Sequence, residues 1–459
     1  MYQIDFKRPE HVHFIGIGGI SMSGLAEILM EEGFTVSGSD SHKSELTEHL
    51  EAKGAQIFYG QRESNVTDDI DVAVYTAAVH PDNPEFGEVQ RKGIPMLTRA
   101  ELLGQMMRNY KYAVGVSGTH GKTTTTSMVT EILLAADLDP TISVGGILSS
   151  IGGNIRVGGS RLFVTEACEY TNSFLSFFPN MEIILNVEED HLDFFKDIQE
   201  IRQSFRQFAQ KLPRDGVLVI NRDMEKYEEL VDGLACRVVT CGKHKDSDYR
   251  AENITFDDTA RASFDLLVKG EKRGRITLGV PGEHNVYNAL AAAALCQALE
   301  VDMEAVRKGL KNFSGTNRRF EKKGEIGGVT IIDDYAHHPK EIEATLSTAK
   351  NYPHKKLWCV FQPHTYTRTR AFLDRFAQAL AAADEVVLAD IYAARETDNL
   401  GISSADIAER IERLGTRAHY FKSFDEIETF LLENCVHGDL LITMGAGDIV
   451  KVGEKLLGK

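Results

Sequence analysis

The sequence predicts an α/β protein with three units in series. Short β-branched runs alternate with longer helical patterns along nearly all of its 459 residues, and this alternation is typical of parallel sheets with right-handed crossovers. Two glycine-rich segments, Gly16–Gly19 and Gly118–Gly121, each stand between a predicted strand and a predicted helix. At roughly 100–200 residues per domain, the length corresponds to about two to four domains. We therefore expect several α/β domains, two of which present a glycine-rich turn at a helix N-terminus.

The order of the predicted elements defines three domains. We expect strands at His11–Ile17, Ile70–Tyr75, Tyr112–Val116, Val329–Asp333, Leu357–Phe361, Glu385–Ala389 and Leu440–Thr443, and helices at Ser21–Glu32 and Thr123–Ala136. One boundary follows a helical run that ends near residue 109, and another lies in the turn-rich stretch 314–318. The predicted domains are 1–109, 110–316 and 317–459.

Composition excludes several classes of protein. The chain carries 51 basic and 68 acidic residues, a net charge of −17, and therefore lacks the basic field that nucleic acid or an anionic membrane attracts. The six cysteines form no Cys-x-x-Cys pair, which favours reduced thiols over disulfides or structural zinc. The N-terminus has no apolar signal-peptide core, and no stretch approaches the ~20 apolar residues of a membrane span. We expect a cytoplasmic protein.

The first glycine-rich turn fits a diphosphate. Gly16, Gly18 and Gly19 would let the backbone approach the ligand, and the following helix would offer free amides to it. Asp40 ends the next strand, near the place of a ribose-binding acid. The third glycine of the dinucleotide fingerprint is replaced by Ser21, so the motif alone is weak. A nucleotide diphosphate, a nicotinamide cofactor and a purely structural turn all stay open.

The second glycine-rich turn predicts a nucleotide triphosphate site. The segment GTHGKTT, residues 118–124, follows a buried strand and opens a helix, although Val116 occupies the first glycine position of a full P-loop. Small residues there expose backbone N–H groups, and Lys122 can bridge the β- and γ-phosphates. The hydroxyl of Thr123 can hold Mg²⁺.

Polar residues follow other predicted strands, where an α/β domain gathers its chemistry. Glu166 and His191 come after two strands of the second domain and are candidate Mg²⁺ ligands, with a solvated acid and a structural histidine as the alternatives. Asn285 and Asn288, three apart on one helix, could contact adenine, unless Asn285 is a helix cap. Arg319 lies at the predicted hinge, where its guanidinium could reach a γ-phosphate.

Nine segments, spread in order over nearly the whole chain, resemble the Mur ligase family. They are HFIGIGGISMSG, GTHGKTTT, TEACEYTNSF, NVEEDHLD, GEHNVYNALAA, GTNRRFE, DDYAHHP, FQPHTYTRT and MGAGD. The resemblance implies a Rossmann-like UDP-sugar domain, a central P-loop ATPase domain and a Rossmann-like C-terminal domain that binds the amino acid. It also implies an ATP- and Mg²⁺-dependent ligase of the bacterial cytoplasm, a monomer or weak homodimer, that joins L-alanine to UDP-N-acetylmuramate for peptidoglycan.

The resemblance also implies roles for individual residues. Those placed around ATP are Gly118, Thr119, His120, Gly121, Lys122, Thr123, Thr124, Asn285, Asn288, Arg319 and Asp334. Those placed around Mg²⁺ are Thr123, Glu166 and His191. Those placed around the UDP-sugar are Gly16, Gly18, Gly19, Asp40, Thr76 and Arg99. Tyr335, His337, His364 and Arg368 are placed around the amino acid, and Lys122, Arg319 and His337 are the implied catalytic residues.

The chain departs from the family pattern at three positions. Cys168 and Tyr170 stand where relatives often have aspartate and serine, which removes one acid from that segment, and Thr365 replaces a common arginine. We therefore expect Arg368 to bind the carboxylate of the amino acid. Three alternatives stay open: a recycling ligase that joins a cell-wall peptide to the same sugar nucleotide, a nicotinamide-linked oxidoreductase, and a nucleotide-switched binding protein without catalysis.

Overall fold

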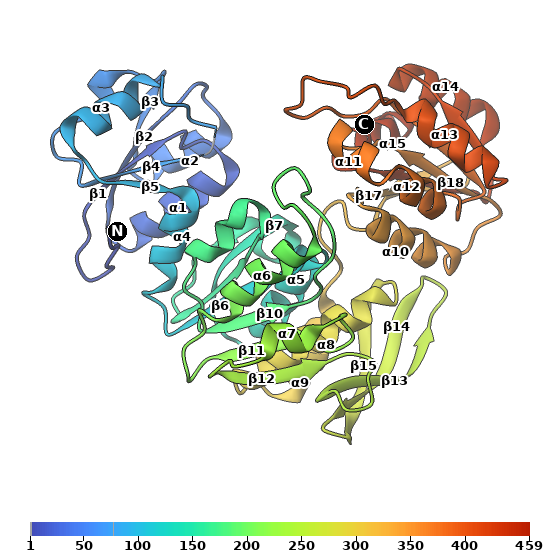
Figure 1. Ribbon diagram of the computed structural model, residues 1–459, viewed down its shortest axis with the longest axis horizontal. Coiled ribbons are helices and arrows are strands. Elements are labelled where there is room, and N and C mark those ends of the chain that lie inside the picture. Colours follow the sequence, from blue (N-terminus) through green and yellow to red (C-terminus); the bar gives the residue numbers. More distant parts are fainter. Residues whose placement is uncertain (1, 77) are drawn as a thin grey trace.

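The computed structural model describes residues 2–76 and 78–459 and contains three α/β lobes that follow one another along the chain (Figure 1). The N-terminal lobe is blue, the central lobe runs from green to yellow, and the C-terminal lobe is orange to red (Figure 1). Each lobe is built around its own sheet, of five, ten and six strands respectively. Among the described residues, every helix is too short or too polar to span a lipid bilayer.

The N-terminal sheet is wholly parallel, in the order β3-β2-β1-β4-β5. Its strands are β1 (His11–Ile15), β2 (Thr35–Asp40), β3 (Gln56–Tyr59), β4 (Val72–Tyr75) and β5 (Met96–Thr98). Its helices are α1 (Ile20–Glu31), α2 (Glu45–Ala52), α3 (Pro84–Lys92) and α4 (Arg99–Met107), with a short 3₁₀ turn η1 (Glu63–Asn65). The strand order reverses between β1 and β4, and ligands of such sheets bind at that point. The turn after β1 therefore lies at the expected crevice.

The central sheet combines a parallel core with antiparallel edges, in the order β15-β14-β13-β12-β11-β10-β6-β9-β7-β8. Its strands are β6 (Tyr112–Ser117), β7 (Thr141–Leu148), β8 (Gly153–Arg156), β9 (Leu162–Glu166), β10 (Met181–Ile184), β11 (Val217–Asn221), β12 (Arg237–Cys241), β13 (Tyr249–Phe256), β14 (Arg261–Val268) and β15 (Glu271–Pro281). Its helices are α5 (Lys122–Ala135), α6 (Ile198–Ala209), α7 (Tyr227–Val231), α8 (His284–Ala298) and α9 (Met303–Asn312), with 3₁₀ segments η2 (Ser149–Ile151) and η3 (Tyr170–Ser176). Helices α5 and α8 pack in one core with the strands, which fixes the turn that precedes α5.

The C-terminal sheet has the order β16-β17-β21-β18-β19-β20, with only β16 antiparallel to its neighbour. Its strands are β16 (Glu321–Ile326), β17 (Val329–Asp334), β18 (Leu357–Phe361), β19 (Glu385–Leu388), β20 (Arg417–Tyr420) and β21 (Leu440–Met444). Its helices are α10 (Pro339–Lys350), α11 (Tyr366–Ala371), α12 (Leu373–Leu380), α13 (Ser404–Arg413), α14 (Phe424–Asn434) and α15 (Val450–Leu456). The carboxyl ends of β17 and β18 carry residues 335–338 and 362–368.

The predicted strands and helices are all present, with ends that differ by up to two residues. The strand predicted to reach Ile17 ends at Ile15, because Gly16 has φ +85° and the N–H groups of Gly16 and Ile17 both donate to the Ser39 carbonyl at 2.9 Å. The helix expected from Thr123 begins one residue earlier, at Lys122. The antiparallel strands β13, β14 and β15 were not anticipated by the alternating α/β pattern.

Candidate active site

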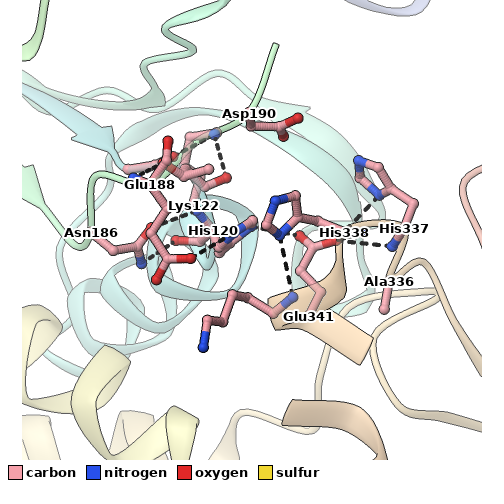
Figure 2. Close-up of polar contacts among 12 residues, drawn as sticks. His120, Lys122, Asn186, Glu188, Asp190, Ala336, His337, His338 and Glu341 are labelled. Carbon is pink, nitrogen blue, oxygen red and sulfur yellow. Dashed lines mark hydrogen bonds and ion pairs between the residues drawn. The ribbon is translucent and has the colours of Figure 1, made fainter. Parts of the chain in front are cut away.

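The turn between β6 and α5 forms a tight phosphate loop. Gly118 (φ +142°) and Gly121 (φ +84°) adopt backbone conformations that favour glycine. A Cβ on Gly118 would also lie 3.0 Å from the Leu185 side chain. Asn186 holds the loop from both sides, because its Oδ1 accepts the His120 N–H at 2.7 Å and its Nδ2 donates to the His120 carbonyl at 3.1 Å. The loop is thus rigid, and the N-terminus of α5 opens beside it (Figure 2).

Lys122 begins α5 with its ammonium group already paired. Its Nζ lies 3.0 Å from Oε2 of Glu169, and it also donates to the Thr119 carbonyl at 3.2 Å. Burial alone would lower the pKa of Lys122, but the Glu169 carboxylate raises it above the ordinary lysine value. Lys122 is therefore a fixed cation. Glu169 was not among the predicted site residues, although it lies in a segment that the resemblance included, three residues after Glu166.

The three predicted Mg²⁺ ligands line one cavity of about 530 Å³ beside the loop. One oxygen of Glu166 accepts the Gly145 N–H at 2.5 Å. Among residues 2–76 and 78–459, the other Glu166 oxygen, the Thr123 hydroxyl and both ring nitrogens of His191 have no hydrogen-bond partner. The His191 ring stacks on Tyr170, with centroids 4.5 Å apart. Two oxygen ligands and an imidazole nitrogen that can each offer a lone pair fit a divalent cation.

The two predicted adenine contacts lie at the start of α8, in a second cavity of about 530 Å³ that also reaches the phosphate loop. Asn285 does not cap the helix, since its Nδ2 donates to the Pro281 carbonyl at 2.7 Å. Asn288 donates to Oδ1 of Asn285 at 2.9 Å. Both side chains are buried. Their assignment to adenine stays a prediction.

The two arginines of the interdomain linker have separate tasks. Arg318 (φ +61°) secures the linker to the C-terminal domain, with Nε 2.9 Å from Asp333 and Nη2 2.7 Å from the Gly445 carbonyl. The guanidinium of Arg319 forms no hydrogen bond or ion pair with any described residue; it lies 5.2 Å from the Tyr335 ring centroid, and Arg319 lines both cavities. Of the two arginines, Arg319 is therefore the one whose guanidinium is free to bind a ligand.

Asp334 organises the same linker from the end of β17. Its two oxygens accept the N–H groups of Phe320 at 2.9 Å and Ala336 at 2.8 Å. Burial raises the pKa of Asp334 to about 6, although Arg319 acts in the opposite direction. The predicted role of Asp334 near ATP is compatible with its place in the wall of the α8 cavity.

Four predicted amino-acid contacts come together at the ends of β17 and β18. The ring centroids of Tyr335 and His337 are 5.5 Å apart, and those of His337 and His364 are 6.0 Å apart. Burial is the main cause that lowers the pKa of His337, and it lowers the pKa of His364 to about 4. Both imidazoles are therefore neutral near pH 7. Arg368 lies within 3.3 Å of His364 through Nη1.

Arg368 has a partner that the sequence did not indicate. Its Nη2 and Nε lie 3.0 and 3.2 Å from one oxygen of Asp190, which belongs to the central domain. Burial would raise the pKa of Asp190, but Arg368 holds it well below the ordinary value. In this structure Arg368 therefore joins two domains, and its predicted contact with the carboxylate of the amino acid stays a prediction.

Further polar contacts join the central and C-terminal domains (Figure 2). His120 Nδ1 lies 3.2 Å from Glu341, and His338 Nε2 lies 3.0 Å from the Glu189 carbonyl. His120, Glu188 and His338 place potential metal-ligand atoms within 4.8 Å of one another. His338, however, uses both nitrogens, because Nδ1 accepts the Lys340 N–H at 3.3 Å. The group is therefore an interdomain polar cluster and not a metal centre.

The predicted UDP-sugar contacts surround the turn after β1. Asp40 accepts the Gly18 N–H at 2.9 Å, so it shapes the turn. Arg99 is half-buried and donates to the Ser21 hydroxyl at 3.2 Å, so the residue at the third glycine position has a structural contact. Thr76 accepts the Ala78 N–H at 3.2 Å. Contact of these residues with a UDP-sugar stays a prediction.

Family models match the three lobes in order. The catalytic-domain model of the Mur ligase family matches residues 11–111, the Mur ligase middle domain matches 116–296, and the Mur ligase glutamate ligase domain matches 318–447. The chain belongs to the Mur ligase family. The predicted family and the predicted three-domain α/β architecture are confirmed.

Individual relatives sharpen this similarity. The chain is 64% identical over 458 residues to the UDP-N-acetylmuramate–L-alanine ligase of Lachnospira eligens, with 100% of both chains covered. It is similar to the crystal structure of a UDP-N-acetylmuramate–alanine ligase from Thermotoga maritima, with a TM-score of 0.79, 31% identity and 98% of each chain covered. A murein peptide ligase from Psychrobacter arcticus, at TM-score 0.68, 24% identity and 98% coverage of each chain, shares the fold.

Proposed function

We propose that this protein is an ATP-dependent ligase that joins L-alanine to the carboxylate of UDP-N-acetylmuramate in peptidoglycan precursor synthesis. The observation that carries the proposal is the meeting of a phosphate loop with a neutral histidine cluster from another domain. Lys122 and His337 line the same cavity, together with Arg319. The full-length identity of 64% to the UDP-N-acetylmuramate–L-alanine ligase of Lachnospira eligens supports the choice of substrates.

The chemistry requires a positive phosphate site. A carboxylate is a poor acyl donor, because its leaving group would be oxide. Transfer of the γ-phosphoryl group of ATP to a carboxylate oxygen releases ADP and leaves an acyl phosphate, whose leaving group is phosphate. Two anions must approach for that step, so Lys122 and Arg319 offset their repulsion and stabilise the transferring charge.

Mg²⁺ fits the donors found beside the loop. Thr123, Glu166 and His191 would hold the ion, since all three line one cavity. When bound, the ion supplies further positive charge to the phosphate oxygens. Replacement of Glu166 by alanine should raise the Mg²⁺ concentration needed for half-maximal activity, while the melting temperature without ligand stays unchanged. Unfolding with a normal Mg²⁺ response would instead assign Glu166 a structural role.

The second step is attack by an amine. Nδ1 of His337 lies 3.0 Å from the Tyr335 carbonyl and donates to it, which leaves Nε2 as an acceptor. Because its pKa is lowered by burial, His337 is ready to accept the proton that alanine loses as its nitrogen attacks the acyl carbon. The docked C-terminal domain shields the acyl phosphate from water. We place this reaction in the bacterial cytoplasm.

One assay separates the candidate functions. Phosphate release is measured with ATP, Mg²⁺ and UDP-N-acetylmuramate across a panel of amino acids and the cell-wall tripeptide. We expect release to require UDP-N-acetylmuramate and to be fastest with L-alanine. Preference for the tripeptide would instead support a recycling ligase. The Psychrobacter relative is a murein peptide ligase, and its 24% identity to this chain indicates the fold alone. Nucleotide binding without turnover would support a switched binding protein.

A further inference from the structure

Glu341 is a buried carboxylate placed between two domains. It lies in the first turn of α10, and its side chain is 15% exposed. Its Oε1 is 3.2 Å from Nδ1 of His120, in the phosphate loop of the central domain. Its Oε2 accepts hydrogen bonds from the backbone N–H groups of His337 at 3.0 Å and His338 at 3.3 Å (Figure 2). One side chain therefore contacts the phosphate loop and the candidate proton acceptor.

The charges on this contact reinforce one another. Burial opposes ionisation of Glu341, but His337, His120 and Arg319 together hold its pKa well below the ordinary value. Burial also opposes the charge on His120, and Glu341 is the main cause of the raised pKa of that imidazole. The His120–Glu341 contact is thus a charge-assisted hydrogen bond away from bulk water, where such bonds are strongest.

His120 transmits the position of the loop. Its backbone is hydrogen-bonded to Asn186 and stands between the two glycines with positive φ, so the base of its side chain has the position that the loop gives it. On the other side, Oε2 of Glu341 lies 3.3 Å from Nδ1 of His337, the nitrogen that also donates to the Tyr335 carbonyl. Glu341 thus helps to hold the ring whose Nε2 is the candidate proton acceptor.

We propose that Glu341 is a positioning residue that couples the phosphate loop to the orientation of His337 through His120. The inference rests on the proposed ligase function. When nucleotide phosphates bind to the loop, His120 holds Glu341, and Glu341 aligns His337 for the incoming alanine. The coupling therefore acts on the amine step, after the phosphoryl group has been transferred. In this scheme Glu341 acts through its contacts with His120 and His337.

The test measures the two steps separately on Glu341→Gln. Hydroxylamine attacks the acyl carbon and displaces phosphate, so formation of a hydroxamate reports the acyl phosphate without alanine. We expect kcat/KM for L-alanine to fall about 10-fold or more, while the rate of hydroxamate formation stays within about 3-fold of the wild type. Retained hydroxamate formation also shows that the variant is folded.

A matched control and a double variant complete the test. Glu343→Gln changes the same residue type on the same helix, where Glu343 forms an exposed pair with Lys340, and both rates should stay unchanged. His120→Asn combined with Glu341→Gln should lose little more alanine activity than Glu341→Gln alone, because the link is already broken. Additive losses, or equal loss of both steps in Glu341→Gln, would overturn the coupling. A wild-type enzyme without UDP-N-acetylmuramate-dependent hydroxamate would overturn the proposed function itself, and this inference with it.

Discussion

The glycine turns at Gly16–Gly19 and Gly118–Gly121 begin in the same way but have different side chains beside them. Both follow the first parallel strand of a lobe, and in both the residue directly after that strand is a glycine with positive φ, Gly16 or Gly118. In the N-terminal turn the carboxylate of Asp40 accepts a hydrogen bond from the backbone N–H of Gly18. In the central turn Lys122 pairs with Glu169, and the C-terminal domain adds Arg319. Amides alone suffice to bind a diphosphate that does not react, whereas a phosphoryl group in transfer needs fixed cations.

The largest expected effect is that of Lys122→Ala. Loss of this cation should reduce turnover at least ~100-fold, because a charge that stabilises the transferring phosphoryl group disappears. Binding of UDP-N-acetylmuramate, measured by calorimetry, should stay nearly intact, since the N-terminal turn is separate. Near-normal phosphate release would abolish the distinction between the two turns.

The stability of the same variant provides a control. Lys122→Ala leaves Glu169 buried without its cation, and breaking a buried pair costs roughly 3–5 kcal/mol. The double variant with Glu169→Gln should recover the melting temperature without recovering activity. Recovery of both would mean that Lys122 acts mainly on folding.

The next effect concerns the cation that lies beyond the central turn, Arg368. Lysine cannot reproduce the planar fork of arginine, so Arg368→Lys should lower kcat/KM for L-alanine about 10- to 150-fold, with little change in the KM for ATP. The comparison variant is Asp190→Asn, which removes the interdomain partner of Arg368. If both variants impair alanine and ATP equally, Arg368 serves domain closure and not the carboxylate of the amino acid.

A smaller effect tests the N-terminal turn. A Cβ on Gly18 would lie 2.8 Å from Oδ2 of Asp40, so Gly18→Ala should distort the turn. We expect binding of UDP-N-acetylmuramate to weaken about 10-fold, while the KM for ATP stays the same. Gly87→Ala in α3, where a Cβ meets open space, is the matched control and should leave binding unchanged. Normal binding by Gly18→Ala would place the sugar nucleotide elsewhere.

The smallest effect is a pH dependence beside the central turn. Burial lowers the pKa of His338 to about 3, from an ordinary value of 6.5. Below pH 6.5 the unfolded chain therefore binds a proton that the folded chain does not. The free energy of unfolding then decreases, as the pH is lowered, by up to about 1.4 kcal/mol per pH unit. His338→Gln should lose less stability than the wild type between pH 7 and pH 5.5 in thermal melts. Parallel pH curves would show that His338 takes up its proton in the fold.

The sequence was more informative about elements and motifs than about contacts between domains. Strand ends such as Glu166 and Asp334 could be predicted because parallel strands direct their carboxyl ends to one edge. The partners of Lys122, Arg368 and His120 could not, because each pair joins segments far apart in the chain and depends on how the domains dock. The antiparallel strands β13–β15 were missed because they follow one another without a helix between them, which departs from the alternating strand–helix pattern.

The sheets are each made from consecutive stretches of chain, and this order has a consequence for synthesis on the ribosome. Domains fold as units from the N-terminus as they emerge, so the phosphate loop can form while residues beyond 317 are still inside the ribosome. At that stage the loop has Lys122 but neither Arg319 nor the His337–Glu341 pair. The incomplete chain can therefore bind a nucleotide but lacks the residues that are proposed to transfer its phosphoryl group. On the proposed function, we expect ATP to be consumed only after the last domain has been translated and has docked.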